Sequence, residues 1–252
     1  LFLACRANDD VNLWTSDGTR AGTVMVKDLA PGGGVFVPIS GAFPRAGRLA
    51  FFATSGPAGD DLWRSDGTAA GTFTLPAAME PWSKTVAWRG KLFFSGRSTA
   101  ATGWEPWVSD GTAGGTVQLA DIGQGKGVSG GFSLPVAGTG QVYFLSNPGT
   151  AGKGYQLWGT RGTPGSTTVI HAADWAQPVP FRDRVLFVHT DGKGAEPWVS
   201  DGTPAGTGIL KDIAPGPAAS IGTMGLQAME LSHRMLFAAN DRTHGAELWS
   251  TD

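Results

Sequence analysis

The sequence has a single cysteine, no cluster of basic residues and no long apolar run, and each absence excludes a class of protein. One cysteine, Cys5, rules out an internal disulfide framework, and its apolar surroundings favour a buried, unreactive thiol. The net charge is −2 and no run of Lys or Arg occurs, so we expect no nucleic-acid partner. No apolar run approaches the roughly 18 residues that a membrane helix needs, so we expect no membrane insertion.

Helical periodicity and familiar catalytic motifs are absent as well. No segment repeats its apolar residues at a 3.6-residue spacing between helix caps. Neither Gly-x-Ser-x-Gly nor His-Glu-x-x-His occurs, and the four His residues have no metal-ligand spacing. The glycine-rich stretch 123–127 leads into no helix whose N-terminus could face a phosphate. We therefore assign no catalytic residues, and we expect an all-β chain.

A Trp followed by Asp-Gly-Thr recurs along the whole chain. Residues 13–19 read Leu-Trp-Thr-Ser-Asp-Gly-Thr, and variants return at 62–68, 106–112 and 197–203. A divergent copy at 157–163 has Arg161 in place of Asp, and residues 248–252 begin a sixth copy. Successive Trp residues are 49, 44, 51, 40 and 51 positions apart. A repeat of this length indicates a solenoid, a propeller or an array.

Each repeat contains up to four short β-type runs, here called strands a, b, c and d. Turns such as Arg89-Gly90 between strands a and b are so short that they join antiparallel neighbours. Between strands c and d, Asp is expected to form an Asx-turn while Gly takes the positive φ. Four antiparallel strands with a longer d–a connection predict the blades of a β-propeller.

Counting strands predicts six blade-like repeats in a single propeller domain, residues 1–252. Strands b and c occur six times but strands a and d only five times, so the first and last blades are incomplete. Leu1 looks like a processed end, and we expect further strands from a longer native chain or from a second chain. An Asp ends strand d in alternate repeats only, which indicates a duplicated two-blade unit and an even ring; these residues are Asp28, Asp121 and Asp212.

The motif resembles that of the ELWxxDGT-repeat proteins, over nearly the whole chain. This resemblance implies a β-propeller and a bacterial protein that is secreted or held at the cell surface. It carries over no catalytic residues, because the family has no common activity. Departures include Pro106 and Pro197 in place of Leu, and Asn12 and Asp61 in place of Glu. With Arg161 in place of Asp, the c–d turn of repeat four should be irregular.

Two repeated side chains have a structural interpretation and a functional one. The motif Trp residues are expected between adjacent sheets, where a flat ring fills space, rather than as sugar-stacking platforms. They are Trp14, Trp63, Trp107, Trp158, Trp198 and Trp249. The Asp residues of the c–d turns are expected to close those turns, because one carboxylate per blade is sparse for calcium.

Candidate metal ligands lie in the b–c loops, which propellers present on the same face as the d–a linkers. Asp9, Asp191 and Asp241 each follow strand b. Their oxygens either hold a calcium ion at the channel mouth or simply close tight loops. Apart from this possible calcium, the sequence indicates no cofactor.

Aromatic residues that do not repeat give the strongest ligand signal. Trp104 and Tyr155 are expected in b–c loops, whereas Trp82 and Trp175 follow strand d in alternate repeats. An aromatic ring among polar groups suits the apolar face of a sugar or a peptide side chain. His244 is a further candidate on the same face. The alternative is that Trp82 and Trp175 plug the short linkers of their blades.

Three functions remain open at this stage. The chain is a binding or scaffold propeller with a glycan or protein ligand on its loop face, a metal-dependent hydrolase or lyase, or a structural segment of a larger surface protein. Scattered aromatics and few His residues favour the binding function. The fold by itself does not choose among them.

Overall fold

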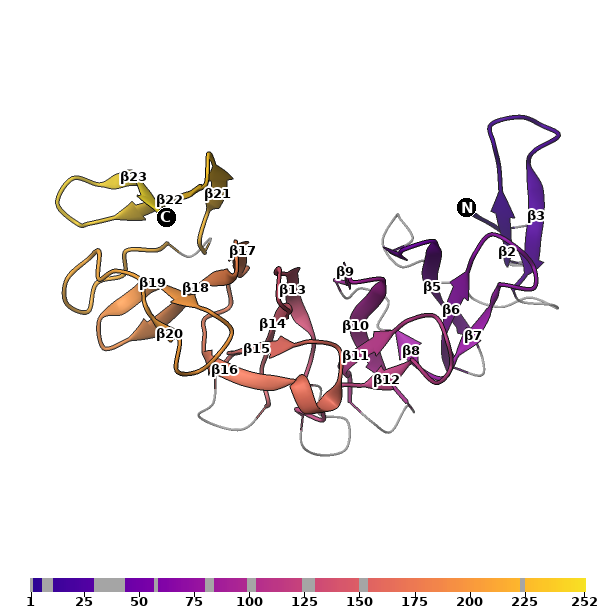
Figure 1. Cartoon of the computed structure of the whole chain (residues 1–252), viewed down its shortest axis with the longest axis horizontal. Coiled ribbons are helices and arrows are strands. Elements are labelled where there is room, and N and C mark those ends of the chain that lie inside the picture. The colour runs from indigo at the N-terminus through magenta and orange to yellow at the C-terminus, as the bar shows by residue number, and fades with distance from the viewer. Residues whose placement is uncertain are drawn as a thin grey trace. The chain divides into compact units, whose positions relative to one another are not determined.

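The computed structural model describes residues 2–5, 11–29, 44–56, 59–79, 84–98, 103–123, 130–149, 154–222 and 225–252. These residues form short antiparallel strands and one 3₁₀ turn, η1 (Pro164–Ser166), as Figure 1 shows. Among them no helix is long and apolar enough to cross a membrane. The expectation of an all-β chain is therefore confirmed for the described residues.

The chain divides into two compact units, Leu1–Thr102 with Trp107–Gln118 and Gly103–Pro106 with Leu119–Asp252. The strands of the first unit are β1 (Phe2–Cys5), β2 (Val11–Thr15), β3 (Val24–Asp28), β4 (Arg45–Ala46), β5 (Leu49–Gly56), β6 (Gly59–Ser65), β7 (Phe73–Leu75), β8 (Ala78–Met79), β9 (Val86–Trp88), β10 (Lys91–Arg97), β11 (Glu105–Ser109, which begins in the second unit) and β12 (Val117–Gln118). Those of the second are β13 (Ser133–Ala137), β14 (Val142–Ser146), β15 (Gln156–Thr160), β16 (Thr168–Ala172), β17 (Val179–Phe181), β18 (Arg184–Asp191), β19 (Gly194–Ser200), β20 (Thr207–Ile209), β21 (Ala228–Leu231), β22 (Arg234–Asn240) and β23 (Ala246–Thr251).

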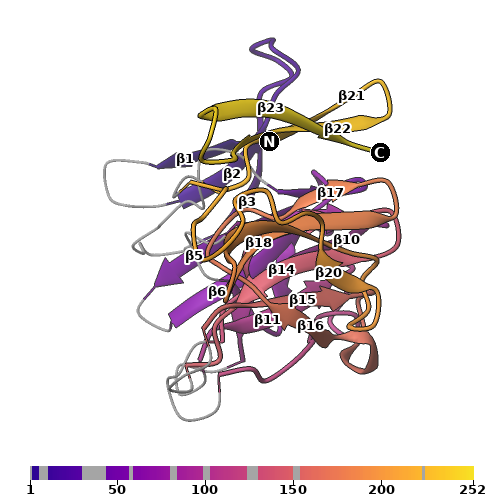
Figure 2. The same cartoon turned by 90° about the vertical axis from the view of Figure 1, so that its left-hand side faces the viewer.

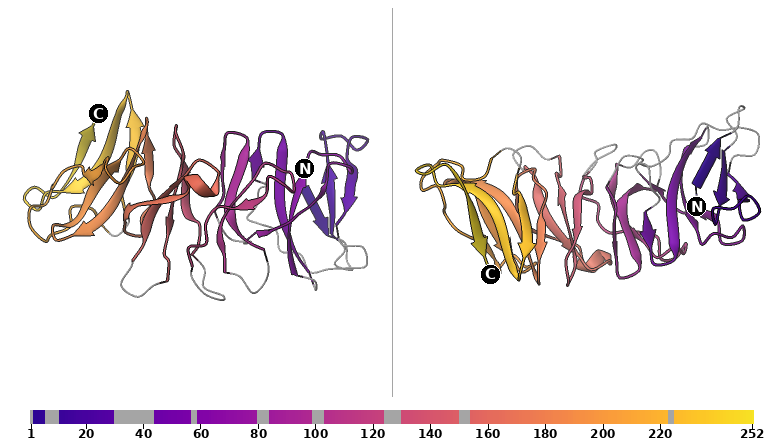
Figure 3. Two further views of the ribbon diagram at one scale, coloured as in Figure 1. Left: turned by 60° about the horizontal axis from the view of Figure 1, so that its bottom comes forward. Right: turned by 90° about the horizontal axis from the view of Figure 1, so that it is seen from above.

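The strands form six antiparallel sheets in which neighbours in sequence lie side by side (Figures 2 and 3). We number them one (β1–β3), two (β4–β7), three (β8–β12), four (β13–β16), five (β17–β20) and six (β21–β23). Sheets two, four and five have the four strands that the repeat predicts. In sheet three, β8 and β9 both pair with β10, so two short strands stand where the sequence indicated one.

In sheets two to six, tight turns join strands a and b, as the sequence indicated. Arg89 and Gly90 both have positive φ, 49° and 75°, which matches the twist of the flanking strands. Ser232 and His233 take the same conformation without a glycine, with φ of 49° and 66°. Non-glycine residues pay a steric penalty in this region, so the β21–β22 turn is strained.

The Asp of each regular c–d turn closes the turn through its own carboxylate. Asp201 Oδ1 accepts hydrogen bonds from Thr203 N at 2.9 Å and Thr203 Oγ1 at 2.7 Å. The hydroxyl and amide of Thr203 together lower the pKa of Asp201. A Cβ on Gly206 would lie 2.1 Å from that carboxylate, so the second glycine of the motif is required by this close approach. The same pattern occurs at Asp17, Asp66 and Asp110. The Asx-turn interpretation is confirmed.

The c–d turn of repeat four differs from the other c–d turns, as expected from Arg161 in place of Asp. Ser166 stands where the other repeats have the second glycine, and its hydroxyl accepts hydrogen bonds from Arg161 N and Thr163 N, each at 3.2 Å. The serine hydroxyl thus replaces the missing Asp carboxylate, and η1 forms there. The two sequence changes in this repeat compensate for each other.

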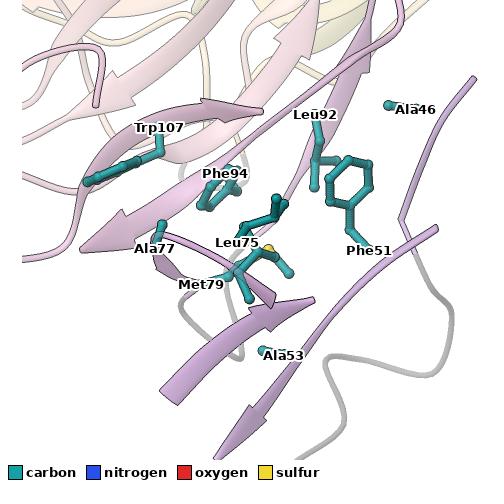
Figure 4. Packing of buried hydrophobic residues seen from close by; sticks show 10 residues of the cluster. Ala46, Phe51, Ala53, Leu75, Ala77, Met79, Leu92, Phe94 and Trp107 are labelled. Carbon is teal, nitrogen blue, oxygen red and sulfur yellow. The ribbon is translucent and has the colours of Figure 1, made fainter. Parts of the chain in front are cut away.

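The core consists of clusters between neighbouring sheets within each unit. Phe51 of sheet two belongs to one cluster with Leu92 and Trp107 of sheet three (Figure 4). Leu186 of sheet five belongs to another with Phe237 of sheet six. Burial of such side chains is the main favourable term in folding. The repeat therefore stabilises the fold chiefly by stacking one sheet on the next.

The motif Trp residues lie against these clusters, although their burial is unequal. Trp107 is 6% exposed, whereas the other five are half-buried. Trp63 stacks on Phe52 of the adjacent strand with ring centroids 6.0 Å apart, Trp158 stacks likewise on Phe144, and Trp198 meets Phe187 with ring planes inclined by 43°. The expected packing between sheets is found, but complete burial is reached only at Trp107.

A contact that the sequence did not reveal couples each of three sheets to the next. Lys27 Nζ lies 5.8 Å from the ring of Trp63, and Lys211 Nζ lies 5.2 Å from that of Trp249. At the corresponding position in repeat four, the His171 ring lies 4.7 Å from that of Trp198. A cation over a Trp face is attracted by the ring quadrupole. The residue near the end of strand d therefore packs on the Trp of the following sheet.

Candidate functional site

Strand pairing in sheet four brings two predicted ligand-binding aromatics together. Tyr155 immediately precedes β15, and Trp175 follows β16 by three residues. Gln156 pairs with Ala172 in the antiparallel ladder, and Ala173 N donates to Tyr155 O at 3.0 Å. The b–c loop and the d–a linker of this repeat therefore lie side by side.

The two rings form an aromatic pair that is open to solvent. The centroids of Tyr155 and Trp175 are 4.7 Å apart and the ring planes are inclined by 43°. The Trp175 side chain is 52% exposed, and Tyr155 is half-buried. Half-exposure of Trp175 favours the ligand-binding interpretation over the linker plug, and both stay predictions. An exposed pair of this kind offers a flat apolar surface with a phenol at its edge.

The linker that carries Trp175 is fixed on both sides. Asp174 N donates to Val188 O at 2.9 Å, and Thr190 Oγ1 donates to Asp174 Oδ2 at 2.6 Å. Gln177 Nε2 donates to Leu134 O at 3.1 Å. These bonds tie the linker to β18 and to β13, so the Trp175 backbone is held in place before any ligand arrives. Asp174, the residue before Trp175, and its partner Thr190 also bring polar oxygens to this linker.

Two histidines and a Trp pack together between sheets four and five. The ring centroids of His171 and His189 are 5.1 Å apart, and that of Trp198 lies 4.7 Å from His171 and 5.2 Å from His189. Burial, and then the neighbouring His171, lower the pKa of His189, whereas Asp174 and Asp191 act in the opposite direction. His189 Nδ1 and Trp198 Nε1 are buried without a hydrogen-bond partner. The cluster thus favours neutral imidazole at position 189.

Other b–c segments also adjoin the linkers of their own repeats. The carbonyl of Trp104, a half-buried residue, accepts a hydrogen bond from Gly131 N at 2.9 Å. Ala195 O accepts from Ser220 N at 3.0 Å. In repeats three, four and five, the b–c and d–a segments therefore meet, as the prediction of a shared loop face requires.

The Glu of the repeat motif fixes these linkers, a role that the sequence did not indicate. Glu196 is fully buried and accepts from Ile213 N at 2.9 Å, Ser220 N at 3.2 Å and Ser220 Oγ at 2.6 Å. Glu105 accepts three backbone bonds, from Ile122, Gly123 and Gly130. Burial raises the pKa of Glu105 although the backbone donors oppose it. The only sequence signal was the recurrence of Glu two residues before Trp.

The two predicted metal ligands among the described residues, Asp191 and Asp241, lie in separate loops. Asp191 Oδ1 accepts from Lys193 N at 2.8 Å and so closes the β18–β19 turn. Asp241 accepts from His244 N and contacts His244 Nδ1, each at 2.8 Å, and these bonds lower the pKa of Asp241 to about 2. The same contact raises the pKa of His244.

One group in the described part of the chain combines three ligand types, Asp241, His244 and Glu247, with ligand atoms within 4.8 Å of one another. Asp191 is not part of that group. Asp9 and Trp82 lie outside the described residues, as does the side chain of Cys5. A calcium site built from the three predicted Asp residues stays a prediction.

Comparisons with known proteins give distant structural likenesses alone. No family model and no curated protein matches the sequence. A puromycin hydrolase is 15% identical with a TM-score of 0.46, over 94% of this chain and 42% of that one. The acylaminoacyl peptidase of Pyrococcus horikoshii is 15% identical with a TM-score of 0.43, over 99% and 42%. TolB from Acinetobacter baumannii is 11% identical with a TM-score of 0.39, over 79% and 50%. The chain spans at most half of each of these proteins, and likenesses this distant assign no activity to it.

Proposed function

We propose that the chain forms a six-bladed β-propeller of a secreted or surface protein and binds a glycan through Tyr155 and Trp175. The observation that carries this proposal is the aromatic pair of Tyr155 and Trp175, with centroids 4.7 Å apart, whose Trp lies on a linker tied to sheets four and five. The apolar face of a pyranose stacks on such rings, and Asp174 and Thr190 supply oxygens for its hydroxyl groups. The proposed location rests on the repeat motif.

A single site of this kind binds weakly. Each stacked aromatic contributes about 1 kcal/mol beyond its buried area. Two rings and a few hydrogen bonds to exposed groups then correspond to a Kd between about 1 mM and about 10 μM. Stronger attachment requires several sites acting together, from other blades or from other copies in an assembly. Trp104 lies at the corresponding place in repeat three and is the first candidate for a second site.

The main test is glycan-array screening of the folded chain, followed by calorimetry on the best ligand. Trp175→Ala should weaken binding by about tenfold or more, and Trp175→Phe should retain part of it, because stacking needs only a ring. Leu231→Ala is the matched control, since it removes another exposed apolar side chain from the same unit. Equal affinity for the Trp175→Ala variant and the unchanged protein would exclude this site.

The competing function is a hydrolase or lyase that uses a divalent metal. What favours it is the convergence of Asp241, His244 and Glu247, because carboxylates and an imidazole are suitable ligands for several metals. A panel of glycoside and ester substrates, assayed with and without a chelator, separates the two functions. Turnover that disappears on chelation and in the His244→Ala variant would replace the binding proposal. Binding without turnover would support it.

A further inference from the structure

Asp followed directly by Gly occurs five times in the chain, and four of these steps lie in c–d turns. The fifth, Asp191-Gly192, lies in the b–c turn between β18 and β19, and both of its residues are exposed. An Asp–Gly step is chemically labile, because glycine has no side chain to hinder its nitrogen as it approaches the Asp carboxyl group. The five steps share this weakness, so their surroundings decide which of them reacts.

The c–d turns hold the reactive pair in contacts that oppose this approach. Gly202 N donates to Ser200 Oγ at 2.9 Å, so its proton is held, and Asp201 Oδ1 accepts two bonds from Thr203. Gly206 packs so closely on the same carboxylate that no Cβ would fit between them. The other three turns repeat the bond from the Gly amide to Ser, at 3.0 Å in each. In all four turns, hydrogen bonds from the following Thr lower the pKa of the Asp carboxyl group, so the neutral form that can lose water is scarce.

The Asp191-Gly192 step lacks these contacts. Asp191 Oδ1 accepts one bond, from Lys193 N at 2.8 Å, and this Asx-turn folds the carboxyl group over the intervening Gly192 nitrogen. Among the described residues, no group accepts from the Gly192 N–H, and no donor other than Lys193 N reaches the Asp191 carboxylate. A Cβ on Gly192 would meet no atom within 4 Å. The nitrogen and the carboxyl carbon are therefore close together, with open space around them.

We propose that Asp191 is a site of spontaneous isoaspartate formation in the folded protein, ahead of the four c–d turns. The Gly192 nitrogen bonds to Asp191 Cγ, and the carboxyl group leaves as one water molecule that carries off the amide proton. The product is a cyclic succinimide. Water then adds to the former main-chain carbonyl of Asp191 and breaks its bond to the Gly192 nitrogen. The chain now runs through the side-chain carbon, and the former main-chain carboxyl group is free. The composition is unchanged, because the water lost in the first step is regained in the second.

The rearrangement changes the turn in which it occurs. Asp191 Cγ becomes part of the main chain, so the turn gains one carbon atom and the carboxylate that accepted from Lys193 N is lost. Asp191 pairs with Gly194 at the end of the β18–β19 ladder, and Thr190 before it donates to Asp174 Oδ2. The linker after β16 should therefore lose part of its attachment as the modification accumulates.

The test is to age the full folded chain at neutral pH and physiological temperature and to map isoaspartate at each Asp–Gly step. Methyl transfer by an isoaspartate methyltransferase measures the total, and electron-transfer fragmentation of proteolytic peptides locates each modified residue. We expect several-fold more isoaspartate at Asp191 than at any of the other four steps. In concentrated urea, the five steps should react at similar rates, because the turns no longer hold any of them.

Gly192→Ala is the main variant, since a Cβ fits there but hinders the attacking nitrogen, and isoaspartate at Asp191 should fall several-fold. Ser16→Ala is the matched control in an exposed c–d turn, where it removes the acceptor of the Gly18 N–H. It should raise isoaspartate at Asp17 and leave the rate at Asp191 unchanged. Circular dichroism checks that both variants are folded. A rate at Asp191 equal to or below that of the c–d turns in the folded chain would overturn the proposal, as would an unchanged rate in the Gly192→Ala variant.

Discussion

Replacing Glu196 with Ala tests whether the motif glutamate fixes the linker of repeat five. Glu196 lies on β19, and its donors Ile213 and Ser220 are 17 and 24 residues further along the chain. The carboxylate is fully buried, so water does not compete for these donors in the folded protein. Removing it leaves the Ile213 N–H without an acceptor, whereas the Ser220 N–H still donates to Ala195 O at 3.0 Å.

The size of the effect follows chiefly from the Ile213 donor. A buried polar group without a partner costs about 1–3 kcal/mol. Water that enters the space left by the side chain reduces this cost. The Ser220 hydroxyl keeps a contact with Ala195 O at 3.5 Å and adds little to the loss. We therefore expect Glu196→Ala to lower the free energy of unfolding by about 2 kcal/mol.

Urea denaturation followed by Trp fluorescence measures this change, and native-state hydrogen exchange locates it. Exchange should rise first at residues 211–221, because the linker loses its attachment before the sheet opens. Glu196→Gln keeps one carbonyl oxygen and should lose less, about 1 kcal/mol or below. Glu230→Ala, at an exposed position on β21, is the control and should change stability by less than about 0.5 kcal/mol. A loss of less than about 1 kcal/mol for Glu196→Ala, with unchanged exchange in the linker, would refute the reasoning.

Three further predictions concern the core and two histidines. Trp107→Ala should cost about 3–5 kcal/mol in denaturant titrations, as for large core aromatics; a cost below about 1 kcal/mol would mean that the ring is not part of the core. The pKa of His189 lies below its ordinary value of 6.5, so the folded state binds this proton less readily than the unfolded state. Stability should be full above about pH 6.5 and fall as the pH decreases below it, and His189→Gln should reduce that slope; an equal slope in the variant would contradict the assignment. The pKa of His244 is raised by Asp241, so NMR titration should place it above 6.5, and Asp241→Asn should return it toward that value. The stabilising pair is then present below about pH 6.5 and lost as the pH rises through the raised pKa of His244; identical titration curves would show that the contact does not form in solution.

The sequence by itself determined the features that are local and repeated. The recurrence of Trp and Asp-Gly-Thr predicted antiparallel sheets, because short turns can join only neighbouring strands. It also predicted the closure of the turn by Asp201, since an Asx-turn involves atoms two residues apart. The irregular turn at Arg161 followed from the same rule. The sequence shows Ser166 in place of the second glycine, but it does not reveal that the serine compensates for Arg161. Only the hydrogen bonds of the structure show this role.

Only the tertiary structure decided which distant groups meet. Tyr155 and Trp175 were placed on one face by the repeat, but their contact depends on how the linker after β16 is tied to β18. The donors to Glu196 lie in a linker whose length differs between repeats, so the repeat spacing does not predict these hydrogen bonds. Lys211 reaches the ring of Trp249 in the following sheet. Local pattern fixes backbone hydrogen bonds between near neighbours, whereas contacts between sheets and linkers depend on packing in three dimensions, and the candidate site is built from the latter.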